Sequence, residues 1–509
     1  MITVANMFGL FVVISFAFAF TNADPLIEFG TLNRSSFPKG FIFGTGSSSY
    51  QYEGAVNEDG RKPSIWDTYT HDHPERIRDG SNADVTVDQY HRYKEDVQII
   101  KDMNMDSYRF SISWSRVIPT GKWDKGRGEN PAGIEYYNNL TNELIANGIQ
   151  PLVTLFHWDL PQGLEDEYGG FLNESIVDDF RDYADLCFNK FGDRVKNWVT
   201  FNEPWLYSNG GYALGNTAPG RCSDPTCLGG NSGTEPYTVT HNQILAHAEA
   251  FHLYRRKYQP RQQGKIGITL VTNWFLPLGD NSIEDDEATS RALDFQFGWF
   301  MDPLTNGKYP ISMQNIVKNR LPKFTLEQSL QVKDSFDFLG LNYYSSSYIN
   351  NAPPPPNEPP SYTTDPRTNT SFEKNGVPLG PRAASVWIYV YPKGLRDLLL
   401  HIKDRYNNPD VYIHENGMNE FNDPTLPVEE ARLDTYRIDY YYRHLYYINS
   451  AIKAGANVKG YFAWTLLDDF EWFNGFTVRF GLYYVDFKDG LKRYPKLSAK
   501  WFQNFLKRN

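Results

Sequence analysis

The sequence predicts an α/β protein built as a single (β/α)8 TIM barrel with long βα loops. Eight short apolar segments, each with the near-continuous pattern of a buried parallel strand, alternate with helical patterns along the 509 residues. Parallel strands joined by helices need right-handed crossovers, and eight such units close into a barrel. In addition, unusual polar residues gather at the carboxyl ends of the strands, where such barrels place their chemistry.

The predicted elements follow in chain order. The strands cover 41–46, 106–113, 150–156, 196–200, 265–271, 336–341, 411–413 and 458–462. Helical patterns between them include 90–103, 133–147, 239–258 and 434–454. The residues at or just beyond the strand ends are Gln51, Arg109, His157, Asn202, Glu203, Asn342, Glu415 and Trp464. The proline-rich stretch 351–360 lies between strands of the same barrel, so it indicates a rim loop rather than a domain boundary.

Two glutamates follow separate strands and indicate paired-carboxylate chemistry. Glu203 lies in Thr-Phe-Asn-Glu-Pro and Glu415 lies in Ile-His-Glu-Asn-Gly. Glycosidic cleavage needs one carboxyl group that protonates the leaving oxygen and another that meets the developing oxocarbenium ion. A separation of about 5–5.5 Å would make the second a nucleophile, with retention of configuration. Arg109 is a natural group to keep that nucleophile ionised. The alternative is structural, with each glutamate only pairing with a nearby cation.

Composition bears on the partners and cofactors. The net charge of −11 argues against nucleic acid, whose phosphates bind basic surfaces, and no run of like charge indicates a membrane-binding patch. The aromatic content of 16% fits core packing and equally fits rings that stack on sugar faces. We expect no metal and no cofactor, because no Cys/His group has zinc spacing and the Gly-x-Gly at 44–46 lacks a dinucleotide fingerprint.

The N-terminus and the cysteines predict a secreted protein. Residues 8–20 are almost wholly apolar, which predicts a signal peptide over 1–23 and a catalytic domain over 24–509, with an uncleaved anchor as the alternative. We expect the secretory pathway, vacuole or apoplast (extracellular), without a membrane segment after cleavage. Cys222 and Cys227 are a plausible disulfide in an oxidising compartment, and Cys187 is expected to be a buried thiol. Glycosylation motifs begin at Asn33, Asn139, Asn173 and Asn369.

From about Phe37 onward the chain resembles the family 1 β-glucosidases, most closely the plant secretory branch and its legume-type enzymes. The motifs that carry the resemblance are the two glutamate motifs, Gln51-Tyr52-Glu53-Gly54, His157-Trp158-Asp159, Asn342-Tyr343-Tyr344 and Glu471-Trp472. The resemblance implies that Glu203 is the acid/base and Glu415 the nucleophile. It implies contacts with the sugar or the substrate for Gln51, His157, Asn202, Trp464, Glu471, Trp472 and Phe480. It also implies support of the nucleophile by Arg109 and Tyr344, of which Tyr344 also lines the substrate site. Asn342 is implied to be a supporting residue, and Trp387 to contact the aglycone.

Two residues depart from the pattern of that family. His414 stands where Thr is usual, and Asp469 stands where Asn is common. Because neighbouring strand residues point to opposite sides, we expect His414 to face away from the sugar.

The resemblance implies a retaining β-glucosidase for O-β-glucosides of plant defence metabolites, with the cyanogenic class favoured. Glu203, rather than Gln, favours O-glucosides over thioglucosides. The alternatives are isoflavonoid or disaccharide glucosides, a transglucosidase, and a non-catalytic sugar-binding glycoprotein. The expected partner is a small β-glucoside, and a homodimer is left open.

Overall fold

The computed structural model describes residues 32–124, 126–354 and 356–508. Residues 1–31, 125, 355 and 509 are outside this description, and the predicted signal peptide lies among them.

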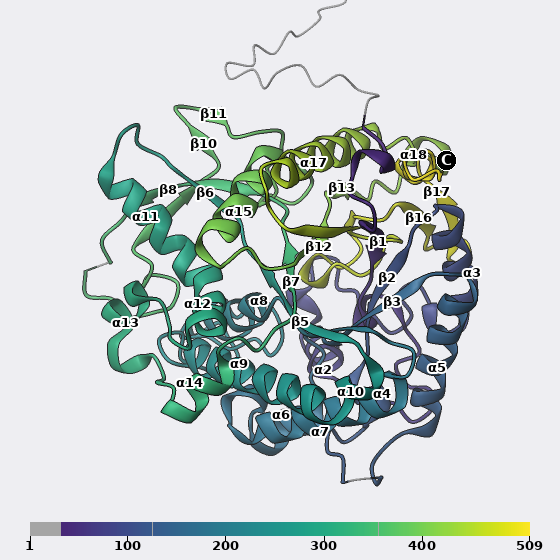
Figure 1. Cartoon of the computed structure of the whole chain (residues 1–509), viewed down its shortest axis with the longest axis horizontal. Helices are drawn as coiled ribbons and strands as arrows, with labels where there is room; N and C mark the ends of the chain where they lie inside the picture. Colours follow the sequence, from purple (N-terminus) through teal and green to yellow (C-terminus); the bar gives the residue numbers. More distant parts are fainter. Residues whose placement is uncertain (1–31, 125, 355, 509) are drawn as a thin grey trace, which may run out of the picture. The chain divides into compact units, whose positions relative to one another are not determined.

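Eight parallel strands form a closed barrel, and each coincides with a predicted strand (Figure 1). Around the barrel the order is β1-β14-β12-β7-β5-β4-β3-β2. The strands are β1 (Ile42–Gly46), β2 (Ser107–Ser111), β3 (Gln150–Phe156), β4 (Asn197–Asn202), β5 (Lys265–Val271), β7 (Leu339–Asn342), β12 (Val411–Asn416) and β14 (Val458–Ala463). The predicted fold class is confirmed, and the main difference is that β4 and β12 run further toward the glutamates than expected.

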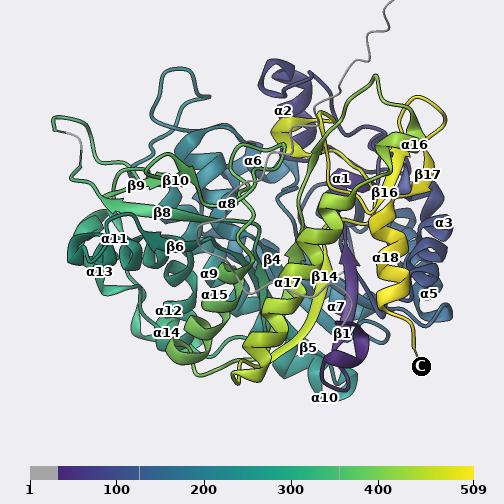
Figure 2. The same ribbon diagram turned by 90° about the horizontal axis from the view of Figure 1, so that it is seen from above.

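Long helices cover the outside of the barrel, and α15 and α17 lie side by side on it (Figure 2). The long helices are α3 (Gln89–Asp102), α5 (Pro131–Ala146), α7 (Ser175–Phe191), α9 (Glu235–Leu253), α15 (Pro392–Arg405) and α17 (Thr435–Lys453). Helix α7 buries one face that includes Cys187, as its pattern predicts, and burial raises the pKa of this thiol. The predicted helix 239–258 changes to a π-helical turn at Tyr254–Tyr258.

Shorter helices occupy the loops. They are α1 (Ser49–Tyr52), α2 (Ile65–Asp72), α4 (Trp114–Val117), α6 (Gln162–Tyr168), α8 (Pro204–Asn209), α10 (Gln259–Gln262), α11 (Ile283–Leu293), α12 (Trp299–Asn306), α13 (Ile311–Val317), α14 (Leu326–Val332), α16 (Val428–Ala431) and α18 (Leu497–Phe505).

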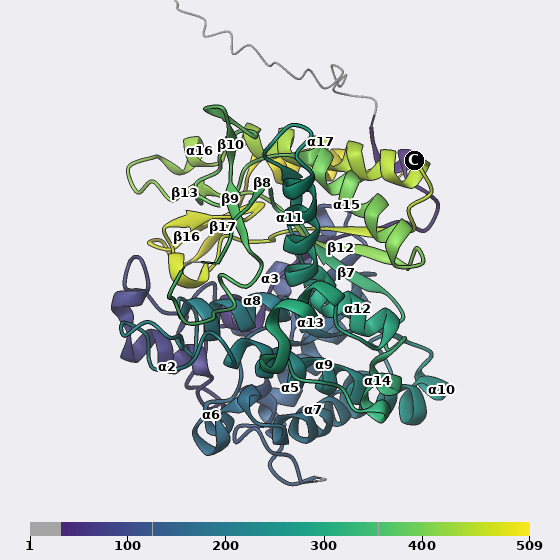
Figure 3. The ribbon, with the colours of Figure 1, turned by 90° about the vertical axis from the view of Figure 1, so that its left-hand side faces the viewer.

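Small sheets are built from the long βα loops. The largest pairs β6 (Trp274–Pro277), β8 (Ser346–Asn351) and β9 (Thr368–Ser371), and α11 packs against it (Figure 3). The others pair β10 (Glu373–Lys374) with β11 (Val377–Pro378), β13 (Glu420–Phe421) with β15 (Val478–Arg479), and β16 (Tyr483–Asp486) with β17 (Lys492–Pro495). The proline-rich stretch after β8 connects two strands of one small sheet, so it is a rim loop.

A break in the alternation along β4 separates Phe201 in the outer core from Val199 in the barrel interior. Phe201 packs outward against Phe171 and Phe180 beneath the helices. Val199, two residues earlier, belongs instead to a separate buried cluster with Leu152, Phe338 and Phe462. Since strand side chains alternate between faces and β4 is irregular between Val199 and Asn202, the two residues can face opposite sides. This small apolar cluster fills part of the barrel interior, whereas the strand ends carry polar groups.

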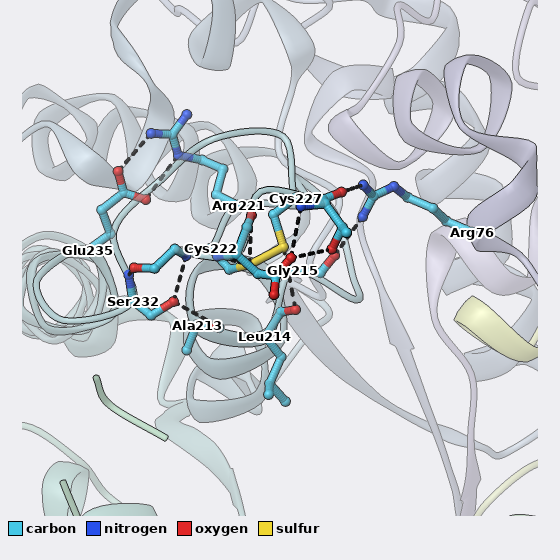
Figure 4. Close-up of a disulfide and its surroundings, with 12 residues drawn as sticks. Arg76, Ala213, Leu214, Gly215, Arg221, Cys222, Cys227, Ser232 and Glu235 are labelled. Carbon is cyan, nitrogen blue, oxygen red and sulfur yellow. Dashed lines mark hydrogen bonds and ion pairs between the residues drawn. A yellow bond between two sulfur atoms is a disulfide. The ribbon is translucent and has the colours of Figure 1, made fainter. Parts of the chain in front are cut away.

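The predicted disulfide between Cys222 and Cys227 is present in the loop after α8 (Figure 4). Its S–S distance is 2.11 Å. Arg76 donates hydrogen bonds to the carbonyls of Gly215 and Thr226, so this loop is tied to the segment that follows α2. An ion pair between Arg221 and Glu235 joins its other side to the start of α9.

Candidate active site

The predicted site residues lie at the carboxyl ends of the barrel strands or in the loops that follow them. Each of the eleven predicted catalytic and substrate-binding side chains is buried except Trp387, which is 37% exposed. Their hydrogen bonds and ring contacts link strands β2, β4, β7 and β12 with the loops after β1, β3 and β14.

Glu415 is held by two donors from different strands. Nη1 of Arg109 lies 2.6 Å from its Oε1, and the Tyr344 hydroxyl donates to its Oε2 at 2.7 Å. Arg109 is fully buried, and the side chain of Glu415 is 4% exposed. A buried carboxylate next to an arginine and a hydroxyl donor is favoured in its charged form. Glu415 therefore has the environment that a nucleophile requires.

Glu203 has a different environment. It follows β4 with a left-handed backbone (φ 46°), and Pro204 begins α8 directly after it. Nδ2 of Asn342 donates to its Oε1 at 2.7 Å, but no cation contacts its carboxyl group within the described part of the chain. Burial and the nearby charge of Glu415 raise the pKa of Glu203 to about 8. A carboxyl group that keeps its proton at neutral pH suits a general acid.

Asn202 connects the surroundings of the two glutamates. Its Oδ1 accepts from Nη2 of Arg109 at 2.5 Å and from Nδ2 of Asn342 at 3.2 Å. Its Nδ2 lies 3.0 Å from Nε2 of His157. Burial and the charge of Arg109 hold the pKa of His157 well below its usual range, so the ring is neutral at neutral pH and Nε2 can accept this hydrogen bond.

Aromatic rings form one wall of the site. The ring of His157 lies nearly parallel to those of Trp464 and Trp472, with centroid distances of 6.0 and 5.9 Å. On the other side, Tyr344 contacts Phe480 and Trp387 edge to face. A wall of flat rings beside a few fixed polar groups is the usual construction of a sugar-binding cleft.

Gln51 and Glu471 occupy the loops beyond β1 and β14. Oε1 of Gln51 accepts from the Ser48 hydroxyl at 2.7 Å, and its Nε2 donates to the carbonyl of Phe470 at 2.9 Å. Gln51 also reaches Oδ1 of Asp469 at 3.2 Å. Burial is the main cause of the raised pKa of Glu471. The segment 469–471 is thus packed against Gln51.

The expectation that His414 and Glu415 point to opposite sides of β12 is wrong, because β12 is not regular. Its pairing with β7 and β14 shifts register between Ile413 and Asn416, which indicates a bulge. The His414 ring therefore lies inside the barrel, against Phe338 and Phe462 and with Nδ1 2.7 Å from the Thr269 hydroxyl. Burial and Arg109 lower its pKa, so it is uncharged at neutral pH.

Sequence reasoning missed two contacts of the site. Nε1 of Trp158 donates to the carbonyl of Asn202 at 2.9 Å, and its left-handed backbone (φ 77°) gave no signal in the sequence. Nε1 of Trp205, two residues after Glu203, donates to the hydroxyl of Tyr362, which follows the proline-rich stretch. The tyrosine hydroxyl in turn donates to the carbonyl of Phe295. The only hints of these contacts in the sequence were that Trp158 adjoins His157 and that Trp205 lies close to Glu203.

The sequence matches the description "Glycosyl hydrolase family 1" over residues 33–509. The chain belongs to this family. It is therefore a glycosyl hydrolase of the β-glucosidase type, and the predicted resemblance is confirmed.

Relatives of this family 1 enzyme cover nearly the whole chain. A "Non-cyanogenic beta-glucosidase" from Trifolium repens is 66% identical over 95% of this chain and 99% of its own length. An "Isoflavonoid 7-O-beta-apiosyl-glucoside beta-glycosidase" from Dalbergia nigrescens is 59% identical over 97% of this chain and 90% of its own. A rice β-glucosidase mutant, solved in a covalent complex with Glc, is 50% identical with a TM-score of 0.92, covering 94% of this chain and 100% of its own.

The structure places the remaining predicted features as follows. Of the glycosylation motifs, Asn33, Asn139 and Asn369 are exposed and Asn173 is half-buried. In the described ranges, no helix is long and apolar enough to cross a membrane. In the same ranges, no three His, Cys, Asp or Glu side chains are grouped to hold a metal ion.

Proposed function

We propose that this family 1 enzyme is a retaining β-glucosidase that hydrolyses plant O-β-glucosides, with Glu203 as acid/base and Glu415 as nucleophile. The contrast between the two glutamates carries this proposal. Glu415 is paired with Arg109 and Tyr344, whereas Glu203 has an amide donor, no cation among the described residues and a raised pKa. One carboxyl group suited to remain protonated and one suited to remain charged are what the two-step reaction requires.

In the first step, Glu203 gives its proton to the glycosidic oxygen while the Glu415 carboxylate attacks the anomeric carbon. The bond from that carbon to the oxygen breaks, the aglycone leaves as an alcohol, and a glucosyl ester forms on Glu415. In the second step, the Glu203 carboxylate takes a proton from water, whose oxygen attacks the anomeric carbon and releases Glu415. Arg109 and Tyr344 fix the orientation of the nucleophile during both steps.

The glycone is proposed to sit against the aromatic wall. Trp464, Trp472 and Phe480 offer apolar surface, and Gln51, His157, Asn202 and Glu471 offer hydrogen-bonding groups. Asn202 is fixed by Arg109 and Asn342, so its position relative to a 2-hydroxyl group is preorganised. Such a contact strengthens in the transition state of glycoside hydrolysis.

The aglycone is proposed to lie between Trp387 and Trp205. Trp387 is the exposed aromatic residue that contacts Tyr344, and Trp205 follows the acid/base and is half-buried. As the natural substrate we propose a plant defence glucoside of the cyanogenic class. An isoflavonoid glucoside is the second candidate, because the Dalbergia nigrescens relative is named for that class and the Trifolium repens relative is named non-cyanogenic.

Glucose release from a panel tests the proposal. The panel contains nitrophenyl β-glucoside, linamarin- and prunasin-type glucosides, an isoflavone glucoside and a disaccharide glucoside, each with and without an added alcohol acceptor. We expect NMR to show that β-glucose is the first sugar released. The natural glucoside that is hydrolysed fastest then identifies the aglycone class. A glucosylated acceptor in place of free glucose would favour the transglucosidase. No turnover by the folded protein would favour the sugar-binding glycoprotein.

We further propose that the protein enters the secretory pathway and reaches the vacuole or apoplast. The apolar segment 8–20, the Cys222–Cys227 disulfide and the exposed glycosylation motifs support this. The plant-expressed protein should begin near residue 24 and lose mass when its N-glycans are removed enzymatically. An intact N-terminus with no glycan would contradict the proposal.

A further inference from the structure

The loop after β14 carries two adjacent aspartates with opposite environments. Asp468 is fully buried, with Nζ of Lys496 2.8 Å from its Oδ1 and Nη1 of Arg479 2.6 Å from its Oδ2. Burial alone would raise the pKa of Asp468, but these two cations outweigh it and lower the pKa. Asp468 is therefore held in its charged form, and both cations are already engaged.

Asp469 is equally buried and has no such partner. It is 1% exposed, and its Oδ1 accepts a hydrogen bond from the neutral amide of Gln51 at 3.2 Å. Its Oδ2 is enclosed by protein and finds no conventional donor among the described residues. Glu471, two residues on, is 6% exposed, and its Oε1 is enclosed in the same way. The two carboxyl groups lie within hydrogen-bonding reach of each other, and the side chains of Tyr52 and Trp464 lie beside Asp469 and Glu471, respectively.

Two ionised carboxylates in contact, without a cation, are unfavourable in a buried site. The charge of each disfavours the charge of the other, and loss of water adds to the cost. One shared proton relieves both effects, because the protonated group then donates a hydrogen bond to its partner. This also supplies the donor that the two enclosed oxygens otherwise lack.

We propose that Asp469 is a positioning residue that shares one proton with Glu471 and thereby fixes the Glu471 carboxylate for binding sugar hydroxyls. The proton engages Oε1, which leaves Oε2 of Glu471 as the acceptor for the sugar. This inference rests on the proposed role of Glu471 in binding the glycone. Burial, followed by the proximity of Glu471, raises the pKa of Asp469, which agrees with the geometry.

The groups that face this carboxyl pair would not replace the proton. The hydroxyl of Tyr52 is engaged by Thr465 and by the carbonyl of Leu467. The titratable groups around the pair are Tyr52, Tyr108, Tyr344, Glu415 and Asp468. None of these is a cation, so raising the pH removes the shared proton and leaves two charges that repel each other.

The dependence of KM on pH tests the inference. In the wild type, KM for nitrophenyl β-glucoside should rise roughly 3- to 10-fold between about pH 6 and pH 9, as the proton is lost and Glu471 is displaced. Asp469→Asn keeps an N–H donor at every pH, so its KM should stay flat. Asp469→Leu has no donor, so its KM should be high throughout. An alkaline rise in Asp469→Asn equal to that of the wild type would overturn the inference.

Asp468→Asn is the matched control. It alters the neighbouring, cation-paired carboxylate, so it should destabilise the fold while KM keeps the wild-type dependence on pH. If Asp468→Asn flattened the KM profile as well, the effect would be a general response of the loop and not a shared proton.

A second measurement does not need turnover. The infrared difference spectrum of the wild type minus Asp469→Asn at neutral pH should contain the C=O stretch of a protonated carboxyl group, and this band should vanish at alkaline pH. Absence of the band would overturn the shared proton. If the band were present in a protein with no glucosidase activity, the proposed function would fail while the shared proton would stand.

Discussion

Two buried carboxyl pairs belong to the same active site but balance their charge differently. Among the described residues, the cation next to Glu203 and Glu415 is Arg109, which contacts Glu415 and not Glu203. Asp469 and Glu471 have no cation among the described residues, and the groups that reach Asp469 from other parts of the chain, such as the amide of Gln51, are neutral. The comparison indicates that a fixed arginine gives two glutamates separate roles, whereas a pair without a cation is left to share a proton.

Removing the proposed nucleophile should have the largest effect. Glu415→Gln should lower turnover of every glucoside by roughly 10⁴-fold or more, because no covalent intermediate can form. Steady-state rates on the substrate panel measure this, with circular dichroism as the check on folding. Residual activity within tenfold of the wild type would mean that Glu415 is not the nucleophile.

Removing the proposed acid should separate substrates by their leaving groups. Glu203→Gln should cost up to about 10⁴-fold with poorly acidic aglycones, but spare the first step for acidic phenols. Azide should rescue the second step and give a β-glucosyl azide. Since the acid must hold its proton, the wild-type kcat/KM should fall as the pH rises through about 8, and in Glu203→Gln only the part of this fall that comes from the rise in KM should remain. Normal rates with poor leaving groups would contradict the assignment.

Removing Arg109 should leave the Glu203–Glu415 pair without a cation, as in the Asp469–Glu471 pair. Arg109→Met leaves Glu415 without its cation and without the donor that fixes its Oε1. We expect activity to fall about 10²-fold. Arg109→Lys keeps a charge and should retain more activity, although it loses the fork that binds both Glu415 and Asn202. Activity of Arg109→Met within about twofold of the wild type would contradict the role given to this arginine.

The smallest expected effect is on the free energy of unfolding, through the Asp469–Glu471 pair. An unfolded chain would have both Asp469 and Glu471 ionised at neutral pH, whereas the folded pair holds a proton. The folded state therefore binds more protons, so the free energy of unfolding should fall as the pH rises through the neutral range. In Asp469→Asn this decline should be shallower in denaturant melts at several pH values. Parallel curves for the two proteins would argue against the folded-state proton.

Much of the barrel and the site was predictable because the signals are local. Each strand is a short apolar run, and the polar residues that follow it, such as Asn202 and Glu415, take their place at the carboxyl end. His414 was misplaced because a bulge breaks the two-residue period on which its prediction depended. The same limitation applies to Trp158, whose left-handed backbone left no mark in the sequence.

Contacts between loops were beyond prediction for a different reason. Asp469 stood out as an unusual residue, but its proximity to Glu471 and its lack of a cation depend on how the loop after β14 folds against Gln51. Likewise, Trp205 and Tyr362 are far apart in the chain, and only the packing of the rim loop brings them together. Long-range pairs of this kind carry no periodicity that a single sequence can reveal.

Trapping the covalent intermediate tests the central claim most directly. A 2-deoxy-2-fluoro-glucoside with an acidic leaving group slows the second step, so the glucosyl enzyme accumulates and can be digested for mass spectrometry. We predict one added fluoroglucosyl group, on the peptide that contains Glu415, and none in Glu415→Gln. A label on another residue, or hydrolysis that releases α-glucose first, would contradict the assignment of Glu415 as the nucleophile of a retaining enzyme.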